Sequence, residues 1–368
     1  MSWAVWITGL PGSGKSTIAR AAVEMIAATG EPVQLLELDD MRRLVTPHAT
    51  YTDAERDLVY RALVYVASTL VDAGVPVVID ATAHRRAWRD LARAVVPAFA
   101  EVQVTCPLDV CREREQTRTG GNAPRGVYAA AGKPGGHVPG IDVAYESAAS
   151  PELAIDTTRE TPAAAGARIA ALVAPWSRGS RQTATPQWTV WITGLPGSGK
   201  TTIASHVAEA LTKRELAVRV LDLADIWAFI TGGPWSPLAE DIAHRALVYA
   251  AKRLNEAGVA VIIDATAPTR IWRELARGVI GRFAEIQLIC PASVCATRER
   301  AVRWRLLGCP HRSLSGVRSG GPDIALAYEH ALGAELTIHT DVEDVWSAVA
   351  SVVRLTLRLR EAASARVA

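Results

Sequence analysis

The chain has 368 residues, enough for two domains of ordinary size, and its 49% hydrophobic and 21% charged residues are typical of globular proteins. Its 40 basic and 38 acidic residues leave a formal net charge of +2, so nothing in the composition favours nucleic acid or an anionic membrane as the main partner. No run of eighteen apolar residues occurs and the first residues already read as a core strand, which predicts a cytoplasmic protein.

A phosphate-binding loop is the first motif along the chain. Residues 9–16 read G-L-P-G-S-G-K-S and residues 194–201 read G-L-P-G-S-G-K-T, and both fit G-x-x-x-x-G-K-[ST]. An apolar run precedes each loop and a helical pattern follows it, which is the order that the motif requires. Glycines let backbone N–H groups turn toward phosphate oxygens, and the helix N-terminus adds partial positive charge. Both copies are therefore predicted to bind a nucleoside triphosphate.

Two side chains in each loop indicate kinase chemistry. The lysine can reach the β- and γ-phosphates of ATP, and the hydroxyl that follows it can ligate Mg²⁺. The predicted nucleotide-binding residues of the loops are Gly9, Gly12, Ser13, Gly14, Lys15, Ser16 and Thr17 in the first copy, and Gly194, Gly197, Ser198, Gly199, Lys200, Thr201 and Thr202 in the second.

Strand and helix patterns alternate after the first loop. Strands are predicted at residues 33–36, 75–79, 101–105 and 153–155, and helices at 53–72, 88–95, 107–114 and 162–173. This alternation predicts an α/β domain with a parallel sheet covered by helices on both faces. Ligands of such sheets bind beyond the carboxyl ends of the strands, where the phosphate loop, Asp39 and Asp80 fall. Residues 117–140, rich in Gly, Pro and Arg, are predicted to form a mobile flap over that edge.

The second half repeats the first. The offset between the copies is 185 residues at the phosphate loop, 184 at Asp80 and Asp264, and 183 at Tyr145 and Tyr328. So small a drift indicates that a whole domain was duplicated. We therefore predict two tandem phosphate-loop domains, residues 1–175 and 188–368, joined by a linker at 176–187.

The class of phosphate-loop protein follows from further patterns. The guanine-reading Asn-Lys-x-Asp is absent from both halves, whereas an arginine-rich flap suits a kinase that must exclude water. The string R-G-V-Y-A-A-A at 125–131 is similar to the K-G-L-Y-x-x-A of adenylyl-sulfate kinases, and P-G-I-D-V-A-Y-E at 139–146 to their T-G-I-D-x-P-Y-E. The chain thus resembles the family that transfers the ATP γ-phosphate to the 3′-hydroxyl of adenosine 5′-phosphosulfate. The resemblance covers each half and implies ATP, Mg²⁺ and a small nucleotide-like acceptor.

Departures from the family pattern leave the acceptor open. The family's Asp-Gly-Asp-Asn-x-Arg corresponds to E-L-D-D-M-R at 37–42, so the second acid and the arginine are kept. Asp80 stands where the family usually has a small residue and looks instead like the magnesium partner of other phosphate-loop kinases. A kinase for another nucleotide or a specialised metabolite is therefore an alternative, and so is a nucleotide-dependent regulatory or binding protein.

Catalytic roles are expected for Lys15, Asp39 and Asp80. Asp39 would orient or deprotonate the acceptor hydroxyl, although an acid at this place could also cap the next helix. Asp80 would hold a metal-bound water or pair with Ser16, with a strand-end cap as the alternative. The predicted metal-binding set is Ser16, Asp80, Thr201 and Asp264.

Anion recognition is assigned to arginines of the first half. Guanidinium groups suit phosphate and sulfate, so Arg42, Arg61 and Arg86 are predicted to hold the acceptor, although any of them could be a solvated surface residue. Tyr128 could stack on a base or anchor the flap by packing. By resemblance, Arg114 and its counterpart Arg298 pack on the adenine of ATP.

The second half is altered on its acceptor side. Asp39 is replaced by Ala224 and Arg42 by Trp227, while Asp225 could supply an acid from one position away. We therefore predict that the second half binds nucleotide but phosphorylates the acceptor poorly or accepts another one. Its expected role is that of permanent partner to the first half in an intramolecular pseudo-dimer, with further homo-oligomers also possible.

Overall fold

The computed structural model describes residues 2–118, 126–133, 136–177, 187–231, 235–307 and 328–364, with backbone alone at 301–307 and 362–364. The chain divides into two compact units, residues 1–183 and 184–368. Most of the predicted linker, residues 178–186, lies outside the described residues, as do residues 119–125 and 134–135 of the predicted flap. Within the described part of the chain, none of the helices combines the length and the apolar character that a membrane crossing requires.

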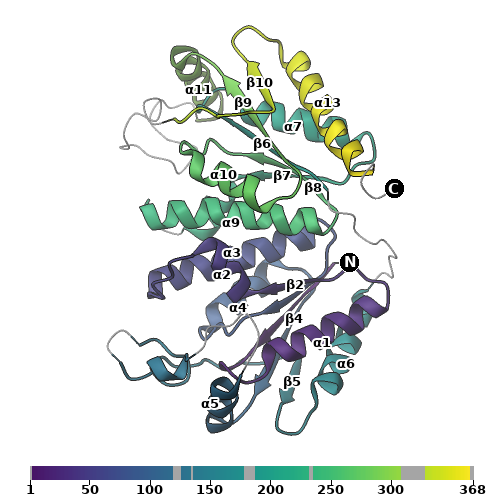
Figure 1. Cartoon of the computed structure of the whole chain (residues 1–368), viewed down its shortest axis with the longest axis vertical. Helices are drawn as coiled ribbons and strands as arrows, with labels where there is room; N and C mark the ends of the chain where they lie inside the picture. Colours follow the sequence, from purple (N-terminus) through teal and green to yellow (C-terminus); the bar gives the residue numbers. More distant parts are fainter. Residues whose placement is uncertain are drawn as a thin grey trace. The chain divides into compact units, whose positions relative to one another are not determined.

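The first unit is a parallel five-stranded sheet with helices on both faces (Figure 1). Its elements are β1 (Ala4–Thr8), α1 (Lys15–Ala28), β2 (Gln34–Glu37), α2 (Leu38–Val45), α3 (Asp53–Asp72), β3 (Val77–Asp80), α4 (Arg86–Val95), β4 (Phe99–Thr105), α5 (Leu108–Thr117), η1 (Tyr128–Ala130), β5 (Leu153–Asp156), α6 (Pro162–Val173) and η2 (Ala174–Trp176). The strand order is β2-β3-β1-β4-β5. The predicted α/β class and the parallel sheet are confirmed.

The alternation of side chains along β1 separates the two faces of the first unit. Val5 and Ile7 point to one face, where they pack in a buried cluster with residues of α1 and α6. Those two helices lie side by side in Figure 1. Trp6 points to the other face, where its ring stacks with Tyr60 of α3, which in turn stacks on Trp88 of α4. Central β1 is therefore buried from both sides, as its unbroken apolar sequence predicts.

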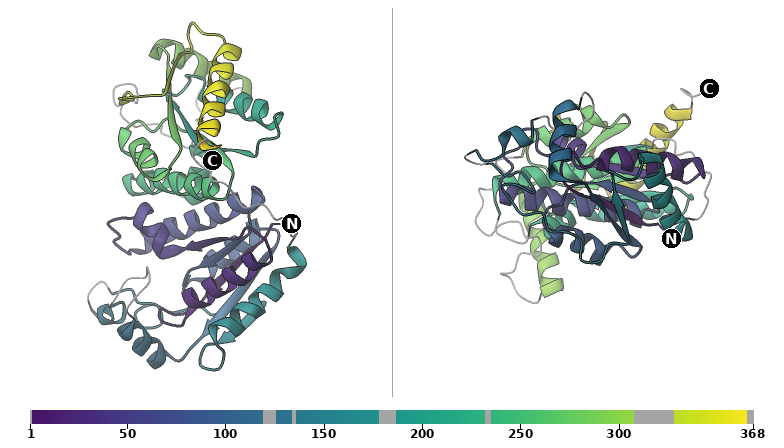
Figure 2. Two further views of the ribbon diagram at one scale, coloured as in Figure 1. Left: turned by 45° about the vertical axis from the view of Figure 1, so that its right-hand side comes forward. Right: turned by 90° about the horizontal axis from the view of Figure 1, so that it is seen from below.

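The second unit repeats this architecture. Its elements are β6 (Thr189–Gly194), α7 (Lys200–Thr212), β7 (Val218–Asp222), α8 (Leu223–Ile230), α9 (Pro237–Glu256), β8 (Ala260–Asp264), α10 (Arg270–Val279), β9 (Phe283–Ile289), α11 (Ala292–Leu307), β10 (Leu336–His339) and α13 (Val345–Ser364). The sheet order β7-β8-β6-β9-β10 matches that of the first unit, and every pairing is parallel. The views of Figure 2 show α7 and α13 covering one face of this sheet.

The sheet register places the strand-end acids beside the loops. Asp80 is in register with Ile7, two residues before the first phosphate loop, and with Glu37 at the end of β2. In the second unit Asp264 is in register with Ile192 and with Asp222. The carboxyl ends of neighbouring parallel strands thus bring these acids to one edge of each sheet.

Candidate active site

The phosphate loops have the glycine-dependent geometry that their sequences predict. Gly12 has φ +76°, and a Cβ built on it would lie 2.2 Å from the backbone oxygen of Cys111. Gly197 has φ +80°, and its Cβ would lie 2.3 Å from the oxygen of Cys295. The loop therefore lies against the first turn of α5 or α11 at a distance that only glycine permits.

The lysine of each loop is buried and bound to the loop itself. Lys15 Nζ donates to the oxygen of Leu10 at 2.9 Å, and Lys200 Nζ donates to the oxygens of Gly194 and Leu195 at 3.1 and 3.0 Å. Burial lowers the pKa of both ammonium groups, while the neighbouring strand-end aspartates oppose that change. Each lysine is thus positioned at the N-terminus of its helix, where phosphate oxygens would replace backbone oxygens as its partners.

A hydroxyl and a carboxylate adjoin each lysine. Thr201 Oγ1 donates to Asp264 Oδ2 at 2.5 Å, and in the first unit the Ser16 side chain acts to lower the pKa of Asp80. Burial raises the pKa of both carboxyl groups, and the nearby lysine partly offsets this. Hydroxyl and carboxylate oxygens are the donors that Mg²⁺ prefers, and they already converge here, so these pairs fit the ion.

The arginine after the fourth strand is fixed by the loop that follows the last strand. Arg114 donates to Thr157 Oγ1 at 2.9 Å and to the oxygen of Thr157 at 3.1 Å. Arg298 makes the equivalent bonds to Thr340, at 3.3 and 2.6 Å. Because two bonds orient each guanidinium plane, either arginine is rigid enough to pack against a planar ring.

A cavity of about 630 Å³ adjoins the loop of the first unit. It brings together the predicted residues Gly12, Gly14, Lys15, Ser16, Thr17, Asp39, Arg42, Asp80 and Arg114. Gly9 and Ser13 are not part of its lining, and Ser13 is fully buried. Burial raises the pKa of Asp39, and the charge of Asp80 raises it further, whereas Lys15 and Arg42 act in the opposite direction. The cavity therefore joins the phosphate end of a nucleotide site to a carboxylate and a guanidinium.

Arg42 is held in the cavity wall by a buried acid that the sequence analysis missed. Arg42 Nη1 pairs with Glu55 Oε1 at 2.8 Å, and Glu55 also accepts from the backbone and hydroxyl of Thr50, both at 2.6 Å. The guanidinium groups of Arg42 and Arg56 both lie over the Tyr51 ring, 4.9 and 6.0 Å from its centre. Arg56 also lines the cavity and donates to the oxygen of His137 at 2.8 Å. The cationic wall thus consists of Arg42 and Arg56.

Arg61 and Arg86, which we expected to bind the acceptor, are engaged elsewhere. Arg61 pairs with Asp57 at 2.9 Å, and Arg86 pairs with Asp90 at 3.5 Å, and neither arginine lines the cavity. Arg56 and Tyr60, four residues apart on α3, share the face that does line it. Arg61 is one residue further along and is therefore turned by about 100° around the helix. Arg61 and Arg86 therefore lie outside the wall of this cavity.

Tyr128 anchors the flap and does not line the cavity. Its hydroxyl donates to the oxygen of Pro11 at 2.8 Å, and its buried ring packs with Cys111 and Val138. Burial raises its pKa. The structure therefore favours the packing alternative over base stacking and fixes this part of the flap to the phosphate loop. Arg125, the first residue of the matching string, lies outside the described residues.

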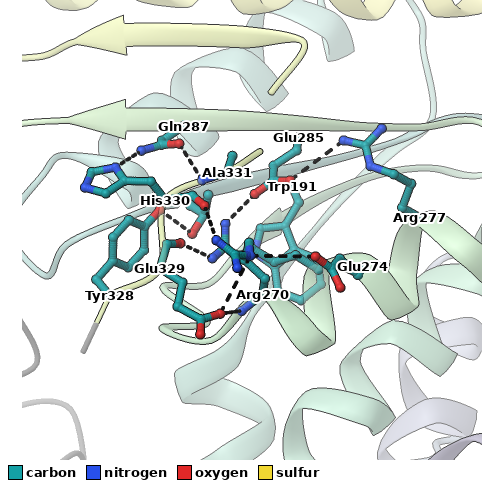
Figure 3. Close-up of polar contacts among 12 residues, drawn as sticks. Trp191, Arg270, Glu274, Arg277, Glu285, Gln287, Tyr328, Glu329, His330 and Ala331 are labelled. Carbon is teal, nitrogen blue, oxygen red and sulfur yellow. Dashed lines mark hydrogen bonds and ion pairs between the residues drawn. The ribbon is translucent and has the colours of Figure 1, made fainter. Parts of the chain in front are cut away.

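The Tyr-Glu pair at the end of each flap forms what we call the Tyr-Glu clamp: Tyr145 with Glu146, and Tyr328 with Glu329. Figure 3 shows the second clamp, where the Tyr328 hydroxyl lies 3.1 Å from Thr193 Oγ1 and the Glu329 carboxylate accepts from the backbone of Arg270 at 2.7 Å. The backbone oxygen of Glu329 also accepts from buried Arg273. The clamp thus ties residues 328–329 to β6 and to the N-terminus of α10.

The first clamp makes the same bonds. The Tyr145 hydroxyl lies 2.9 Å from Thr8 Oγ1, the Glu146 carboxylate accepts from the backbone of Arg86 at 2.6 Å, and the Glu146 oxygen accepts from Arg89. These bonds give Tyr145 and Glu146, the last two residues of the string at 139–146, a structural role. The side chains of Tyr145 and Glu146 hold the fold beside the cavity and do not line it, whereas Pro139 at the start of the string does.

The second unit has a different acid near its lysine from the one we expected. Asp225 and Ala224 are exposed on α8. Asp222, at the end of β7, is half-buried and in register with Asp264. Burial raises its pKa, and Asp264 raises it further, while Lys200 acts against them. The structure thus brings Asp222 to the edge of the sheet beside the strand-end acid, and Asp225 lies near enough that its charge also raises the pKa of Asp264.

Comparisons with known proteins match both halves of the chain. A family model described as adenylylsulphate kinase matches residues 1–156 and 186–339. A probable adenylyl-sulfate kinase of Archaeoglobus fulgidus is 34% identical over 161 residues, which cover 43% of this chain and 98% of that protein. An adenylyl-sulfate kinase of Geotalea uraniireducens is 39% identical over 160 residues, covering 42% of this chain and 72% of that protein. The solved APS kinase CysC of Mycobacterium tuberculosis, in complex with AMPPNP and APS, is 23% identical with a TM-score of 0.38, covering 46% and 97% of the two chains.

Proposed function

Since the chain belongs to the adenylylsulphate kinase family and is an ATP-dependent kinase, we propose that its first unit phosphorylates the 3′-hydroxyl of adenosine 5′-phosphosulfate. One observation carries the proposal. A single cavity joins the phosphate loop, the carboxylate of Asp39 and the cationic wall of Arg42 and Arg56. An acceptor with phosphate and sulfate groups needs such a wall, and a transferred phosphoryl group needs the loop.

The residues of the cavity divide the work of transfer. Backbone N–H groups of the loop and Lys15 hold the β- and γ-phosphates, and Arg114 packs on the nucleotide. The acceptor oxygen forms a bond to the γ-phosphorus while the bond to the bridging oxygen of ADP breaks, and the hydroxyl proton passes to Asp39. Ser16 and Asp80 would hold Mg²⁺ directly or through water, and the ion would neutralise charge on the phosphates. Arg42, fixed by Glu55, positions the acceptor.

The pH dependence of kcat/KM tests the role of Asp39. The carboxylate must be ionised to take a proton, and burial and Asp80 raise its pKa above the ordinary 3.8. Activity should therefore be constant at high pH and fall as the pH decreases through the raised pKa, tenfold per pH unit below it. The profile is measured as product formation with excess ATP and subsaturating acceptor. A kcat/KM that is unchanged down to pH 4 would contradict this role.

Direct detection of the 3′-phosphorylated product tests the function itself. Asp39→Ala should lower acceptor-dependent turnover by roughly 10²–10⁴-fold, the range for loss of a general base. The matched control is Asp40→Ala, in the same turn of α2 but outside the cavity lining, which should retain turnover within about threefold. If a folded, ATP-binding protein makes no product, the acceptor is a different nucleotide or metabolite. A slow ATPase that no acceptor stimulates would instead indicate a regulatory protein.

Several expectations from the sequence stay predictions. These are the domain boundaries, a cytoplasmic location, the pairing of the two units and the formation of further homo-oligomers. The roles of the individual site residues are part of the proposal.

A further inference from the structure

The second unit keeps the whole donor side of the site. Lys200 is bound to the loop as Lys15 is, Thr201 is bonded to Asp264, and Arg298 is fixed by Thr340. These groups serve only the phosphates, the ring and the metal ion of a nucleotide. A unit that had become purely structural would have no need of them.

An acid is also available on the acceptor side. Asp222 holds the place of Glu37, which in the first unit pairs with Arg20 at 2.5 Å. The residue equivalent to Arg20 is Ser205, five positions after the loop lysine in each unit, so the arginine that neutralises the first acid is missing from the second. Asp222 Oδ1 accepts from the backbone of Ala224 at 2.8 Å, which fixes the carboxylate at the start of α8.

The cationic wall has been replaced residue by residue. Trp227 stands for Arg42, Ala239 for Glu55, and Glu240 for Arg56, as the alignment of α2 with α8 and of α3 with α9 shows. Glu240 accepts from Trp235 Nε1 at 3.0 Å. Two guanidinium groups and their buried acid have thus become an indole ring, a carboxylate and a methyl group, and Trp235 adds a second indole ring beside the carboxylate. A phosphate or sulfate group would be repelled here, whereas an uncharged ring would find aromatic surface.

A buried histidine provides an independent indication of a ligand. His244 takes the place of Tyr60, and its ring stacks on Trp272 at 3.7 Å as Tyr60 stacks on Trp88. Its Nδ1 lies 2.9 Å from the oxygen of Glu240, and burial lowers its pKa to about 4. A backbone oxygen only accepts, so Nδ1 carries the proton of the neutral ring.

His244 Nε2 is therefore an acceptor. The side chain is 2% exposed, and among the described residues this nitrogen has no hydrogen-bond partner. Tyr60, at the same position in the first unit, lines the cavity. An unpaired buried acceptor costs about 1–3 kcal/mol, which a ligand O–H or N–H would recover.

We propose that the second unit is a second phosphoryl-transfer centre whose acceptor is an uncharged, ring-bearing alcohol of the nucleoside class, with Asp222 in the role of Asp39. The acceptor oxygen bonds to the γ-phosphorus of ATP, the bond to the bridging oxygen of ADP breaks, and the hydroxyl proton passes to Asp222 and then to water. A nucleoside is the class to expect, because loss of the anion contacts from a duplicated nucleotide site leaves the ring and the hydroxyl to be recognised. The inference rests on the proposed function only in taking ATP and Mg²⁺ as the donor.

Adenosine is the probe, and the test uses the full chain with the first unit silenced by Lys15→Ala. Adenosine should stimulate ADP formation at least tenfold in this variant and yield phosphorylated adenosine by mass spectrometry. Adding Asp222→Asn to this variant should lower its adenosine-dependent turnover at least 100-fold. Asparagine still caps a helix, so this loss would not reflect unfolding of α8. The matched control is Asp344→Asn, an exposed acid that likewise accepts from backbone N–H groups at the start of a helix, here α13, and it should retain the rate.

The reciprocal variant separates this proposal from the function proposed for the first unit. Lys200→Ala should lose the adenosine-dependent product and keep the one formed from adenosine 5′-phosphosulfate. The second proposal is overturned alone if Lys15→Ala shows no adenosine-dependent product while Lys200→Ala still phosphorylates adenosine 5′-phosphosulfate. It is also overturned if Asp344→Asn removes as much turnover as Asp222→Asn does.

Discussion

Replacing Gly12 by alanine is expected to abolish ATP binding in the first unit while the second unit still binds. The new Cβ would lie 2.2 Å from the backbone oxygen of Cys111, a contact that no side-chain rotation relieves because both atoms belong to the backbone framework. The positive φ of +76° adds strain for any residue with a Cβ. The loop must therefore move, and its N–H groups no longer converge on the phosphates. We expect at least a 100-fold loss of affinity, about 2.7 kcal/mol.

Calorimetric titration with a non-hydrolysable ATP analogue and Mg²⁺ measures this result as the number of sites per chain. Gly197→Ala is the mirror variant, since its Cβ would lie 2.3 Å from the oxygen of Cys295, and it should remove the other site. Gly278→Ala is the matched control, because a Cβ at that position would meet no atom of the described residues within 4 Å and both sites should persist. If Gly12→Ala still bound the same number of nucleotides per chain, nucleotide binding would not depend on this loop.

The fold could be predicted because its signals are local. The strand ending at Asp80, the helix from Asp53 to Asp72 and the glycine loops each depend on patterns within about twenty residues. The second half supports the same prediction, because its elements follow in the same order and its phosphate loop lies 185 residues after the first. The structure shifts the ends of elements, such as β3, which begins at Val77 instead of Val75, and it adds helix α2 (Leu38–Val45), which was not predicted.

The acceptor side could be predicted only in part, because it is assembled from separate elements. Asp39 and Arg42 were found from the pattern after β2, and both line the cavity. Arg56 was missed and Arg61 chosen in its place, since the sequence does not show which face of α3 meets the cavity. Glu55 was missed because its importance arises from a contact with Arg42 thirteen residues earlier.

The Tyr-Glu clamp illustrates how a distinctive string can have a structural cause. Its pattern suggested a specific task, yet Tyr145 and Glu146 bond to Thr8 and to the start of α4, far away in sequence. These bonds join the segment before β5 to the central strand beside the phosphate loop. The clamp's backbone is in turn held by Arg89, which donates to the oxygen of Glu146.

Arg89→Met is expected to destabilise the first unit by about 3–5 kcal/mol, the range for breaking a buried ion pair. Arg89 is 1% exposed, its Nε lies 2.6 Å from Glu101 Oε1, and it donates to the oxygens of Ala83 and Glu146. Methionine fills similar space but leaves a buried carboxylate and two carbonyl groups without this donor. A chain with two units need not unfold in one step. The measurement is therefore hydrogen exchange detected by mass spectrometry, with the peptides of each unit analysed separately.

Arg93→Met is the control for this experiment, because Arg93 contacts the same acid. Its side chain is 39% exposed and lies 3.8 Å from Glu101 and 2.6 Å from Glu152, so its loss should cost about 1 kcal/mol or less. Arg273→Met should destabilise the second unit to a similar extent, because Arg273 pairs there with Glu285 and donates to the oxygen of Glu329. Equal losses for Arg89→Met and Arg93→Met would mean that surface charge, and not the buried pair, supports the clamp. If Arg89→Met instead increases hydrogen exchange mainly around Tyr145 and Glu146, the arginine stabilises the clamp more than it stabilises the core.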